Sequence, residues 1–345
     1  MIRIGVLGTA NIAERRMVPA VLKHPDFEYI GVATAAREET GTDCTEEAFL
    51  SIQKRKAKRA EDFAVKFGGE TVIGYENMLK RTDIDAVYIP LPPALHFKWI
   101  MLALQYGKHV ISEKPLTVRA VESQCAVREA EERSLALIEN YGFCYHHQMK
   151  LIQEYVRDNS IGNIRLIRAS FCFPHREESD FRYSKGLGGG ALLDCGGYTV
   201  KAASIFLGPS SRIISQNLVI TPGHEVDIYG SATMRNKDGL CAQLSFGMDN
   251  AYICELEVWG STGTVKAARA FTAPDGYGAP VIIRQGNNTE ERMVADDQFF
   301  ELLTEFEKCI GSSDRRIQEY DNMLLQSRLV EEIGQNSESF EMRVS

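Results

Sequence analysis

The hydrophobic positions in the first 140 residues form short apolar runs that alternate with amphipathic stretches. The apolar runs predict strands at 2–7, 29–34, 86–89, 109–112 and 135–138, with a short strand or turn at 71–75. The amphipathic stretches predict a helix that ends at Lys23 and further helices at 54–67, 75–80, 96–106 and 118–133. Strands that alternate with helices form parallel sheets covered by helices on both faces. This part of the chain is therefore predicted to be an α/β Rossmann domain with a doubly wound parallel sheet.

The pattern changes beyond residue 140, where strand-like runs follow one another directly. Strands are predicted at 164–173, 212–220, 227–234, 240–247, 252–259 and 264–267, and helices at 191–206, 297–309 and 320–333. Tight breaks at 237–239 and 260–263 are typical of hairpins. We therefore expect two domains, 1–140 and 141–345, the second an α+β domain with a large, open, mainly antiparallel sheet. A length of 345 residues suits two domains.

Composition narrows the classes of function. The formal net charge of -8 argues against a nucleic-acid groove as the main site, because such a groove needs a basic face. No apolar run has membrane-spanning length and no signal-peptide pattern opens the chain, so we expect no membrane partner. The eight cysteines include no C-x-x-C pair and are interpreted as reduced thiols, which favours the cytoplasm.

The turn after the first strand is the first candidate binding site. Its sequence is G-T-A-N-I-A, in which alanines replace the second and third glycines of the G-x-G-x-x-G dinucleotide pattern. Backbone N–H groups at a helix start can hold a pyrophosphate, whereas an ordinary tight turn is the alternative. Its position at the first strand of an alternating domain favours nucleotide binding. The expected cofactor contacts are Gly8, Thr9, Ala10, Asn11 and Ile12.

The residues after the second strand predict which dinucleotide is bound. NAD sites place an acid there and NADP sites an arginine. Here the strand ends at Thr34, and Arg37 precedes the first acid, Glu38. Arg37 could clamp a 2′-phosphate, so NADP(H) is preferred and NAD(H) stays open. Most of the basic run at 54–59 is interpreted as a solvated helix face.

Two further segments of the first domain are cofactor candidates. Leu91 and Pro92 open a proline-stiffened loop expected to pass under the cofactor, and His96 either touches the dinucleotide or caps the next helix. Glu113 and Lys114 follow a parallel strand at its carboxyl end, where open α/β sheets bind ligands. Lys114 is therefore expected to act near the reacting carbonyl, electrostatically or as an acid.

The second domain supplies the other half of the predicted site. Asp194 and Tyr198 follow the glycine-rich turn at 188–190. They lie four residues apart, a spacing that places both on one face of a helix. If Lys114 meets them there, a lysine beside a tyrosine forms a proton donor for carbonyl reduction. Arg182 is expected to meet an anionic group of the substrate.

His147 is a further candidate for substrate binding in this domain. The adjacent pair His146–His147 is also a possible metal site. It has no carboxylate or cysteine partner at ligand spacing, so no metal is expected.

Taken together, these motifs resemble the Gfo/Idh/MocA oxidoreductases. The markers are the fingerprint turn and the segments 107–110, 113–116 and 188–198. Within that family the chain most resembles the sugar 3-ketoreductases of dTDP-deoxysugar biosynthesis, through the strings at 10–16, 89–96 and 243–248.

The resemblance implies a role for each catalytic candidate. Lys114 would lie beside the nicotinamide and the substrate carbonyl, with its peptide to Pro115 often cis in relatives. Tyr198 would donate the proton, and Asp194 would hold a sugar hydroxyl or order the donor. The resemblance also implies a homodimer or homotetramer formed through the second sheet. One departure is an insertion around 38–53, after which Arg55 competes with Arg37 as the phosphate ligand.

The sequence therefore predicts an NADP(H)-dependent oxidoreductase that reduces a keto group on a nucleotide-linked sugar by hydride transfer. One alternative is an NAD(P)-dependent dehydrogenase of a free sugar, a cyclitol or a dihydrodiol, with the same pair acting as a base. The other is a non-catalytic NADP-binding regulator, which is disfavoured because Lys114, Asp194 and Tyr198 are all present.

Overall fold

The computed structural model describes residues 1–39, 46–336 and 339–341. The chain forms two compact units. The first consists of Met1–Leu116, Val121–Asn140 and Leu302–Asp321, and the second of Thr117–Ala120, Tyr141–Glu301 and Asn322–Ser345. The first unit thus includes a segment from near the end of the chain, beyond the single boundary at residue 140 that the sequence suggests.

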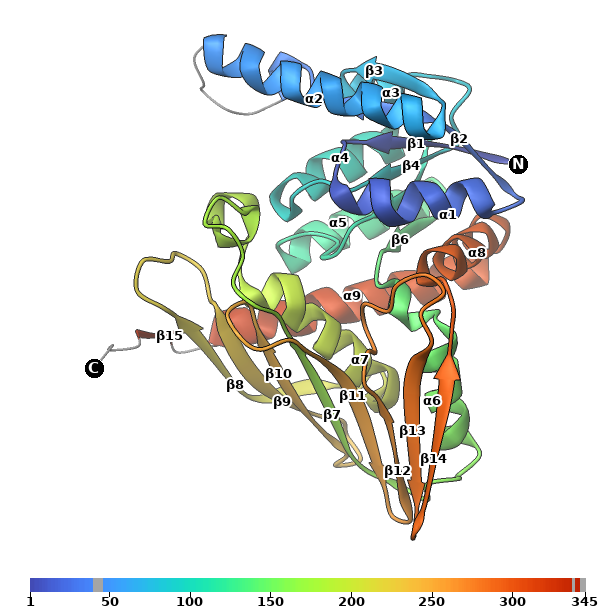
Figure 1. Ribbon diagram of the computed structural model, residues 1–345, viewed down its shortest axis with the longest axis vertical. Helices are drawn as coiled ribbons and strands as arrows, with labels where there is room; N and C mark the ends of the chain where they lie inside the picture. Colours follow the sequence, from blue (N-terminus) through green and yellow to red (C-terminus); the bar gives the residue numbers. More distant parts are fainter. Residues whose placement is uncertain (40–45, 337–338, 342–345) are drawn as a thin grey trace. The chain divides into compact units, whose positions relative to one another are not determined.

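The first unit is built on a six-stranded parallel sheet (Figure 1). Its strands are β1 (Ile2–Leu7), β2 (Phe27–Thr34), β3 (Glu70–Ile73), β4 (Ala86–Ile89), β5 (His109–Ser112) and β6 (Leu137–Glu139), in the order β3-β2-β1-β4-β5-β6. The helices between them are α1 (Val18–Lys23), α2 (Glu46–Phe67), α3 (Tyr75–Leu79), α4 (Pro93–Gln105) and α5 (Ala120–Glu132). All four residues of β4 are buried, as expected of a central parallel strand covered on both faces. The predicted doubly wound parallel sheet is confirmed.

Part of α8 (Gln298–Gly311) completes the core of the first unit. Phe306 stacks on Phe27 at the start of β2, with ring centroids 6.4 Å apart, and lies edge-on to His109 at the start of β5. Thr304 lies 3.1 Å from His24, in a side-chain hydrogen bond. These contacts explain why a segment distant in sequence belongs to this unit.

The second unit is built on a nine-stranded mixed sheet in the order β14-β13-β12-β11-β7-β10-β9-β8-β15. The strands are β7 (Ile164–Cys172), β8 (Arg212–Ile220), β9 (Tyr229–Arg235), β10 (Cys241–Gly247), β11 (Ile253–Gly260), β12 (Gly263–Ala267), β13 (Ala279–Gln285), β14 (Asn288–Val294) and β15 (Ser339–Glu341). The pairs β7–β10 and β8–β15 are parallel and the remaining pairs are antiparallel. The predicted open, mainly antiparallel sheet is confirmed.

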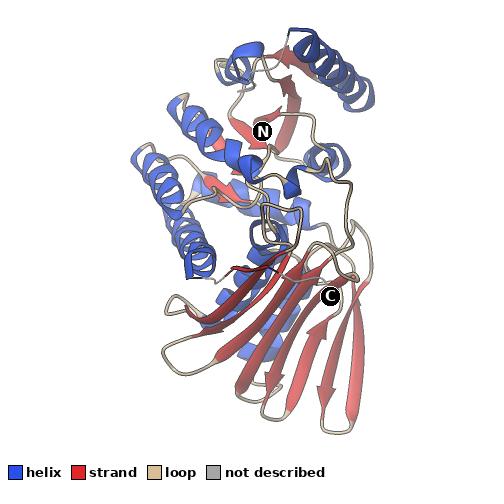
Figure 2. Cartoon of the chain, turned by 90° about the vertical axis from the view of Figure 1, so that its left-hand side faces the viewer, coloured by secondary structure: helices blue, strands red, loops and turns tan. Residues whose placement is uncertain are grey.

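The helices of the second unit lie on one face of this sheet (Figure 2). They are α6 (His147–Arg157), α7 (Gly197–Leu207) and part of α9 (Ser313–Asn336). Alternation along β10 turns Ala242, Leu244 and Phe246 into the core, where each is 2% exposed or less. This alternation is the signal from which the sequence predicted the strand.

Several elements depart from the sequence prediction. Helix α2 begins at Glu46 and not at residue 54, so it takes up much of the expected insertion, of which residues 40–45 lie outside the described residues. Strand β14 and its partner β13 were not predicted; the first six residues of β14 are exposed and show no alternation. Helix α6 was also missed.

Close packing in the second unit gives a test of the fold. A Cβ added to Gly197 in α7 would lie 2.1 Å from Tyr141 Oη, whereas one added to the helical Gly334 would meet only Leu192 at 3.6 Å. We expect Gly197→Ala to lower the free energy of unfolding by about 1–3 kcal/mol through overpacking. The control Gly334→Ala should leave it unchanged or raise it by up to about 1 kcal/mol through helix propensity. Urea unfolding measures both, and equal midpoints for the two variants would contradict the packing described.

Candidate functional site

The turn after β1 has the backbone that a dinucleotide site needs. Gly8 has φ +116°, which favours glycine, and its N–H donates to Ala33 O at 2.9 Å. A Cβ at Gly8 would approach Leu91 Cδ2 to 3.0 Å. Thr9, Ala10 and Ile12 are half-buried and Asn11 is exposed, so this turn presents backbone at the carboxyl end of β1. N–H groups in that position suit a pyrophosphate.

Arg59 of α2 contacts this turn, a role that the sequence interpretation missed. Its Nη2 donates to Asn11 Oδ1 and lies 3.4 Å from Glu14 Oε2. Arg55 is exposed one helical turn earlier, and residues at i and i+4 share a helix face. At least part of the basic run is therefore directed towards the fingerprint turn and not wholly into solvent.

The segment after β2 carries an exposed arginine and an acid that is already hydrogen-bonded. Arg37 is exposed in the short 3-10 turn Arg37–Glu39, after the buried Thr34. The carboxylate of Glu39 accepts hydrogen bonds from the backbone N–H groups of Ala36 at 2.7 Å, Tyr75 at 2.9 Å and Glu76 at 3.0 Å. Glu39, the second acid after β2, is thus committed to holding the first turn of α3, whereas Glu38 before it is exposed.

His96 has a different role from those that the sequence suggested. It lies in the first turn of α4, is 0% exposed, and its Nδ1 and Nε2 each lie 2.7 Å from a carbonyl oxygen, of Pro115 and Leu91 respectively. Burial lowers the pKa of its imidazole. Both ring nitrogens are occupied inside the unit and the helix cap is Pro92, so His96 neither caps α4 nor offers a nitrogen to a dinucleotide. It links the loop at Leu91 to the segment that carries Lys114.

Lys114 stands half-buried just beyond β5, on a backbone fixed from several sides. The Lys114–Pro115 peptide is cis, as the resemblance implies. Leu116 N–H donates to Glu139 at 2.7 Å, and Pro115 O contacts His96. These contacts hold the residues that follow Lys114.

The residue before Lys114 is fixed as well. Glu113 accepts hydrogen bonds from Tyr88 Oη and Asn140 Nδ2, both at 2.5 Å, and burial raises the pKa of this carboxyl. Its carboxylate is thus held by its own unit, while the lysine that follows stands at the ligand-binding edge of a parallel sheet.

In the second unit, Asp194 is held by Arg182. Asp194 is 9% exposed and accepts from Arg182 Nε at 2.7 Å, while Asp180 lies 3.1 Å from Arg182 Nη1. Burial alone would lower the pKa of Arg182, but the two carboxylates raise it above its ordinary value. The structure therefore places Arg182 on Asp194, which it holds in position.

Tyr198 is enclosed by aromatic rings. Tyr141 and Phe171 lie edge-on to it at 5.0 and 5.1 Å, and Phe143 and Phe271 lie 5.8 Å away. Tyr198 itself is only half-buried, so these rings surround it without closing it off from solvent. Sequence spacing gave no sign of this wall, because its members come from separate elements.

The local helix differs from the one expected over 191–206. Residues Leu192–Gly196 form a wide π-type turn, and α7 begins only at Gly197. Asp194 lies in this turn and Tyr198 is the second residue of α7, so the pair spans a junction. Such turns are frequent at functional sites.

Asp227 fixes the start of this turn, and the sequence interpretation missed it. Its Oδ2 accepts from Leu192 N–H at 2.7 Å, and its backbone oxygen accepts from Ala191 N–H at 2.8 Å. Gly190 has φ +119°, and a Cβ there would lie 2.4 Å from Asp227 Oδ1. Burial raises the pKa of Asp227 to about 6. The only sequence signal was an acid at the beginning of a predicted apolar strand.

His147 begins α6 and pairs with Asp296. Its Nδ1 lies 2.8 Å from Asp296 Oδ2, and its backbone N–H donates to the same oxygen at 2.8 Å. Asp194, Tyr198 and Arg182 lie in the same unit as His147, and Lys114 lies in the other. The convergence of Lys114 with Tyr198 therefore stays a prediction.

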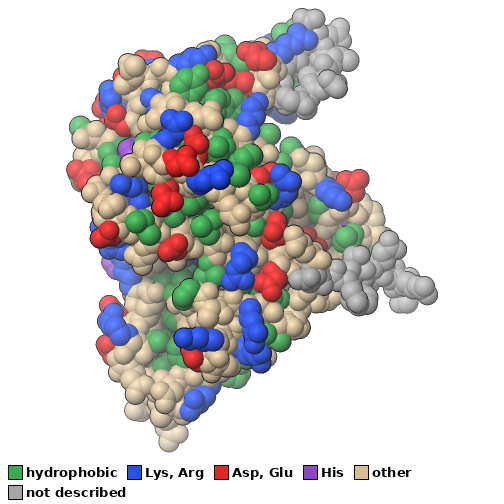
Figure 3. Space-filling model, turned by 180° about the vertical axis from the view of Figure 1, so that it is seen from behind, with side chains coloured by type: hydrophobic (Ala, Val, Ile, Leu, Met, Phe, Trp, Pro, Cys, Tyr) green, Lys and Arg blue, Asp and Glu red, His purple; other side chains and the backbone are tan. Residues whose placement is uncertain are grey.

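On the face shown in Figure 3, acidic and basic side chains are interspersed and form no field of one sign. Within the described ranges, no helix is long and apolar enough to cross a membrane.

Comparisons with known proteins cover nearly the whole chain. Residues 2–141 match the model of an oxidoreductase family with an NAD-binding Rossmann fold, and residues 149–266 match the GFO/IDH/MocA C-terminal domain. The dTDP-3,4-didehydro-2,6-dideoxy-alpha-D-glucose 3-reductase of Actinomadura kijaniata is 37% identical over 96% of this chain and 94% of its own length. The NADP-dependent D-xylose 1-dehydrogenase 2 of Haloferax volcanii is 26% identical over 97% of both chains.

A solved structure is similar to this chain over almost its whole length. KijD10, a 3-ketoreductase from Actinomadura kijaniata in complex with NADP and TDP-benzene, has a TM-score of 0.88 and 36% identity, with 99% of each chain covered. A tyrosine-to-phenylalanine and a lysine-to-alanine variant of that enzyme have also been solved with the same two ligands.

The buried carboxyl of Asp227 predicts a pH dependence of stability. Its native pKa of about 6 lies above the ordinary 3.8, so the folded protein holds this proton more tightly than the unfolded chain does. The stabilisation that protonated Asp227 gives the fold is therefore fully present below about pH 4 and is lost as the pH rises through about 6. Relative to Asp227→Asn, which keeps an acceptor for Leu192 N–H, the wild type should lose at most about 3 kcal/mol of unfolding free energy over this range.

Urea unfolding at several pH values measures this difference, with Asp238→Asn, at an exposed turn, as the control. Parallel stability curves for the wild type and Asp227→Asn would show that the carboxyl is not perturbed in this way.

Proposed function

Because the chain belongs to the Gfo/Idh/MocA oxidoreductase family, we propose that it is an NADP(H)-dependent reductase of a keto group on a nucleotide-linked deoxysugar. The observation that carries this proposal is the extent of the similarity to 3-ketoreductases. It covers both the domain with the dinucleotide turn and the domain with Tyr198, at 36–39% identity over 90–97% of this chain. The dTDP-sugar is the proposed substrate class.

The first unit fits a dinucleotide. The N–H groups of residues 8–12 would hold the pyrophosphate, and Gly8 lets the backbone approach closely. Glu39 is bound to three backbone N–H groups, whereas Arg37 is an exposed cation just after β2, with Arg55 and Arg59 on α2 as further cations. This charge pattern favours a 2′-phosphate and hence NADP(H). NADPH supplies the hydride when bound.

Tyr198 is proposed as the proton donor to the carbonyl oxygen. A phenol is protonated at neutral pH, and a nearby ammonium favours the phenolate that remains after transfer. Lys114 would supply that ammonium if the carboxyl edge of β5 and the start of α7 converge on the substrate. The aromatic wall fixes the direction of the Tyr198 ring, which lowers the cost of aligning the donor.

Asp194 is proposed to accept a sugar hydroxyl close to the reacting carbon. A carboxylate has several acceptor positions, and the hydrogen bond from Arg182 Nε engages one of them. Arg182 holds this carboxylate in place, so it acts as a positioning residue. His147 is retained as a substrate contact on the rim of the second unit, where it is exposed and already paired with Asp296.

Two alternatives are less well supported. A free-sugar dehydrogenase is represented among the relatives, but at 26% identity. A non-catalytic NADP-binding regulator would not need Lys114, Asp194 and Tyr198 together. A panel of dTDP-, UDP- and GDP-linked keto sugars and free sugars, followed by NADPH absorbance, separates these functions.

We propose the cytoplasm as the compartment and a homodimer or homotetramer as the assembly. The reduced cysteines support the compartment, because seven described cysteines have no disulfide partner. A broad sheet whose helices gather on one face supports assembly through the other.

Removing the phenolic oxygen of Tyr198 tests the mechanism. Tyr198→Phe should lower kcat by about a hundred- to ten-thousand-fold, the usual contribution of a general acid, because the ring still packs but has no proton to give. NADPH binding, followed by fluorescence titration, should be retained. Tyr277→Phe, an exposed tyrosine of the same unit, is the control and should leave kcat unchanged. A fully active Tyr198→Phe enzyme would exclude Tyr198 as the donor.

Cofactor choice has its own test. Arg37→Ala or Arg55→Ala should raise KM for NADPH about ten- to a hundred-fold and change KM for NADH little, because only the 2′-phosphate contact is lost. Lys54→Ala, exposed beside Arg55, should change neither constant. If both arginine variants kept the wild-type ratio of the two KM values, neither side chain would be the phosphate ligand.

A further inference from the structure

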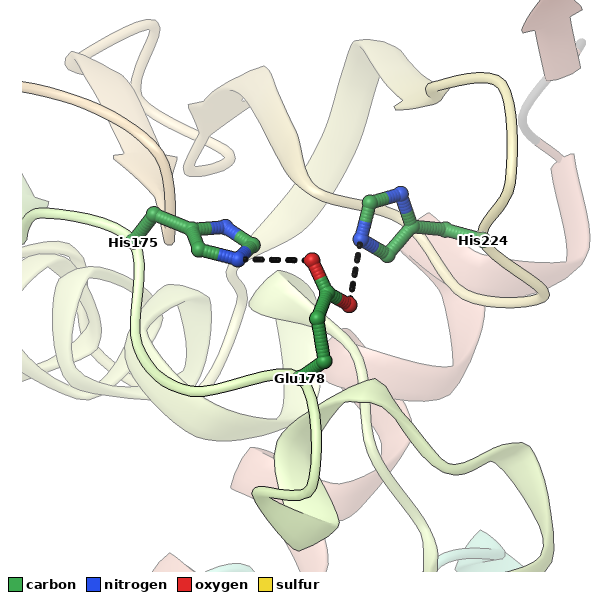
Figure 4. Close-up of side chains that lie close together, drawn as sticks. All are labelled: His175, Glu178 and His224. Atoms are coloured by element: carbon green, nitrogen blue, oxygen red, sulfur yellow. Dashed lines mark hydrogen bonds and ion pairs between the residues drawn. The ribbon is translucent and has the colours of Figure 1, made fainter.

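We propose that His175, Glu178 and His224 form a binding site for one divalent cation of the zinc class. His175 and Glu178 lie in the segment after β7, and His224 lies in the connection between β8 and β9 (Figure 4). His175 Nε2 is 3.0 Å from Glu178 Oε1, and His224 Nε2 is 3.8 Å from Glu178 Oε2. One ligand atom from each residue lies within 4.8 Å of the other two. Three donors from two segments thus converge on one point.

The outer nitrogens of both imidazoles are held by oxygens. His175 Nδ1 lies 3.2 Å from Tyr183 Oη, and the two rings are stacked with centroids 4.8 Å apart. His224 Nδ1 lies 3.0 Å from Thr221 Oγ1. An oxygen partner on the second ring nitrogen is the arrangement that orients metal-binding histidines. Both Nε2 atoms are thereby turned towards Glu178.

The inner nitrogen of His224 is an independent sign of a missing partner. The His224 side chain is only 16% exposed. Among the residues that the structure describes, no group lies within hydrogen-bond distance of its Nε2, which is buried. Buried polar atoms are normally paired, so an orphaned nitrogen aimed at a carboxylate calls for a cation or a proton between them.

The donor set selects the kind of cation. Two imidazole nitrogens and one carboxylate are a zinc set, with a fourth position left for water, whereas Ca²⁺ and Mg²⁺ prefer oxygen ligands. Zinc–ligand bonds of about 2.0–2.2 Å require Glu178 to rotate by a small amount, which its 75% exposed side chain allows. This proposal departs from the sequence expectation of no metal, which weighed only the adjacent histidines at 146 and 147.

A second group of possible ligands does not support a comparable proposal. His147, Asp296 and Glu301 also lie within reach of one another. Glu301 already forms an ion pair with Lys150 at 2.6 Å, and Asp296 accepts from both the ring and the backbone of His147. These acids are satisfied without a cation.

The proposed cation would join two segments that flank the catalytic residues of the second unit. The segment with His175 continues to Asp180 and to Arg182, which pairs with Asp180 and holds Asp194. The connection with His224 continues to Asp227, which holds the glycine-rich turn. The site lies outside the proposed proton-transfer residues, so its cation would stabilise these two segments and take no part in hydride transfer.

The test uses untagged full-length protein freed of metal by a chelator. Zn²⁺ is added in a calorimetric titration, and Co²⁺ is added as a spectroscopic probe of the ligand set. We expect one ion per chain, and we expect His175→Ala and His224→Ala each to weaken Zn²⁺ binding at least about a hundred-fold. Glu178→Gln should weaken it markedly, whereas Glu177→Gln, the neighbouring acid, should bind as the wild type does.

Tyr183→Phe keeps all three ligands but removes the oxygen beside His175 Nδ1. It should weaken Zn²⁺ binding by about ten- to a hundred-fold, the usual effect of losing such a partner. Zn²⁺ should also raise the Tm of the wild type and not that of His224→Ala, with circular dichroism confirming that each variant folds. A wild type that takes up no Zn²⁺, which would leave a hydrogen-bonded His–Glu–His cluster, overturns the proposal. So does binding that survives His224→Ala or that is lost equally in Glu177→Gln.

Discussion

The bond from Leu192 N–H to the Asp227 carboxylate fixes the start of the helical segment that carries Asp194 and Tyr198. Because Gly190 has no Cβ, the carboxylate can come within reach of the turn and take up an N–H at the start of the helical segment. The π-type turn that follows places Asp194 against Arg182 and Tyr198 among its aromatic neighbours. The buried carboxyl of Asp227 thus fixes the start of the segment in which Asp194 and Tyr198 lie.

Side chains of the first unit likewise bind backbone groups near the carboxyl edge of its parallel sheet. Glu39 binds three backbone N–H groups beside the expected ribose, and Glu139 binds Leu116 N–H beyond Lys114. His96 joins two backbone carbonyls across the same edge. Side chains bonded to backbone groups hold loops that have no sheet or helix partner of their own. These bonds tie the segments that carry the proposed binding residues to neighbouring parts of the unit.

The sequence predicts the elements whose pattern is local. Alternating and continuous apolar runs predict both sheets, and glycine and proline positions indicate the turns beside Gly8 and Lys114. What it misses depends on contacts between distant segments: Asp227 on Leu192, Glu39 on Tyr75 and Arg59 on Asn11. An isolated acid or arginine belongs to no periodic pattern in the sequence, so its partner can be identified only in the folded structure. Strand β14 was missed because its side chains face solvent and carry no alternation.

Strand β14 also constrains how copies of this chain can associate. It is the last strand at one end of the nine-stranded sheet, and an unprotected border of that kind invites foreign strands to add to it. Its central residues are Glu290, Glu291 and Arg292, and Glu290 pairs with Arg292 at 2.6 Å. An incoming strand would have to strip water from these charges. These charges therefore disfavour the addition of a further strand at this edge of the sheet.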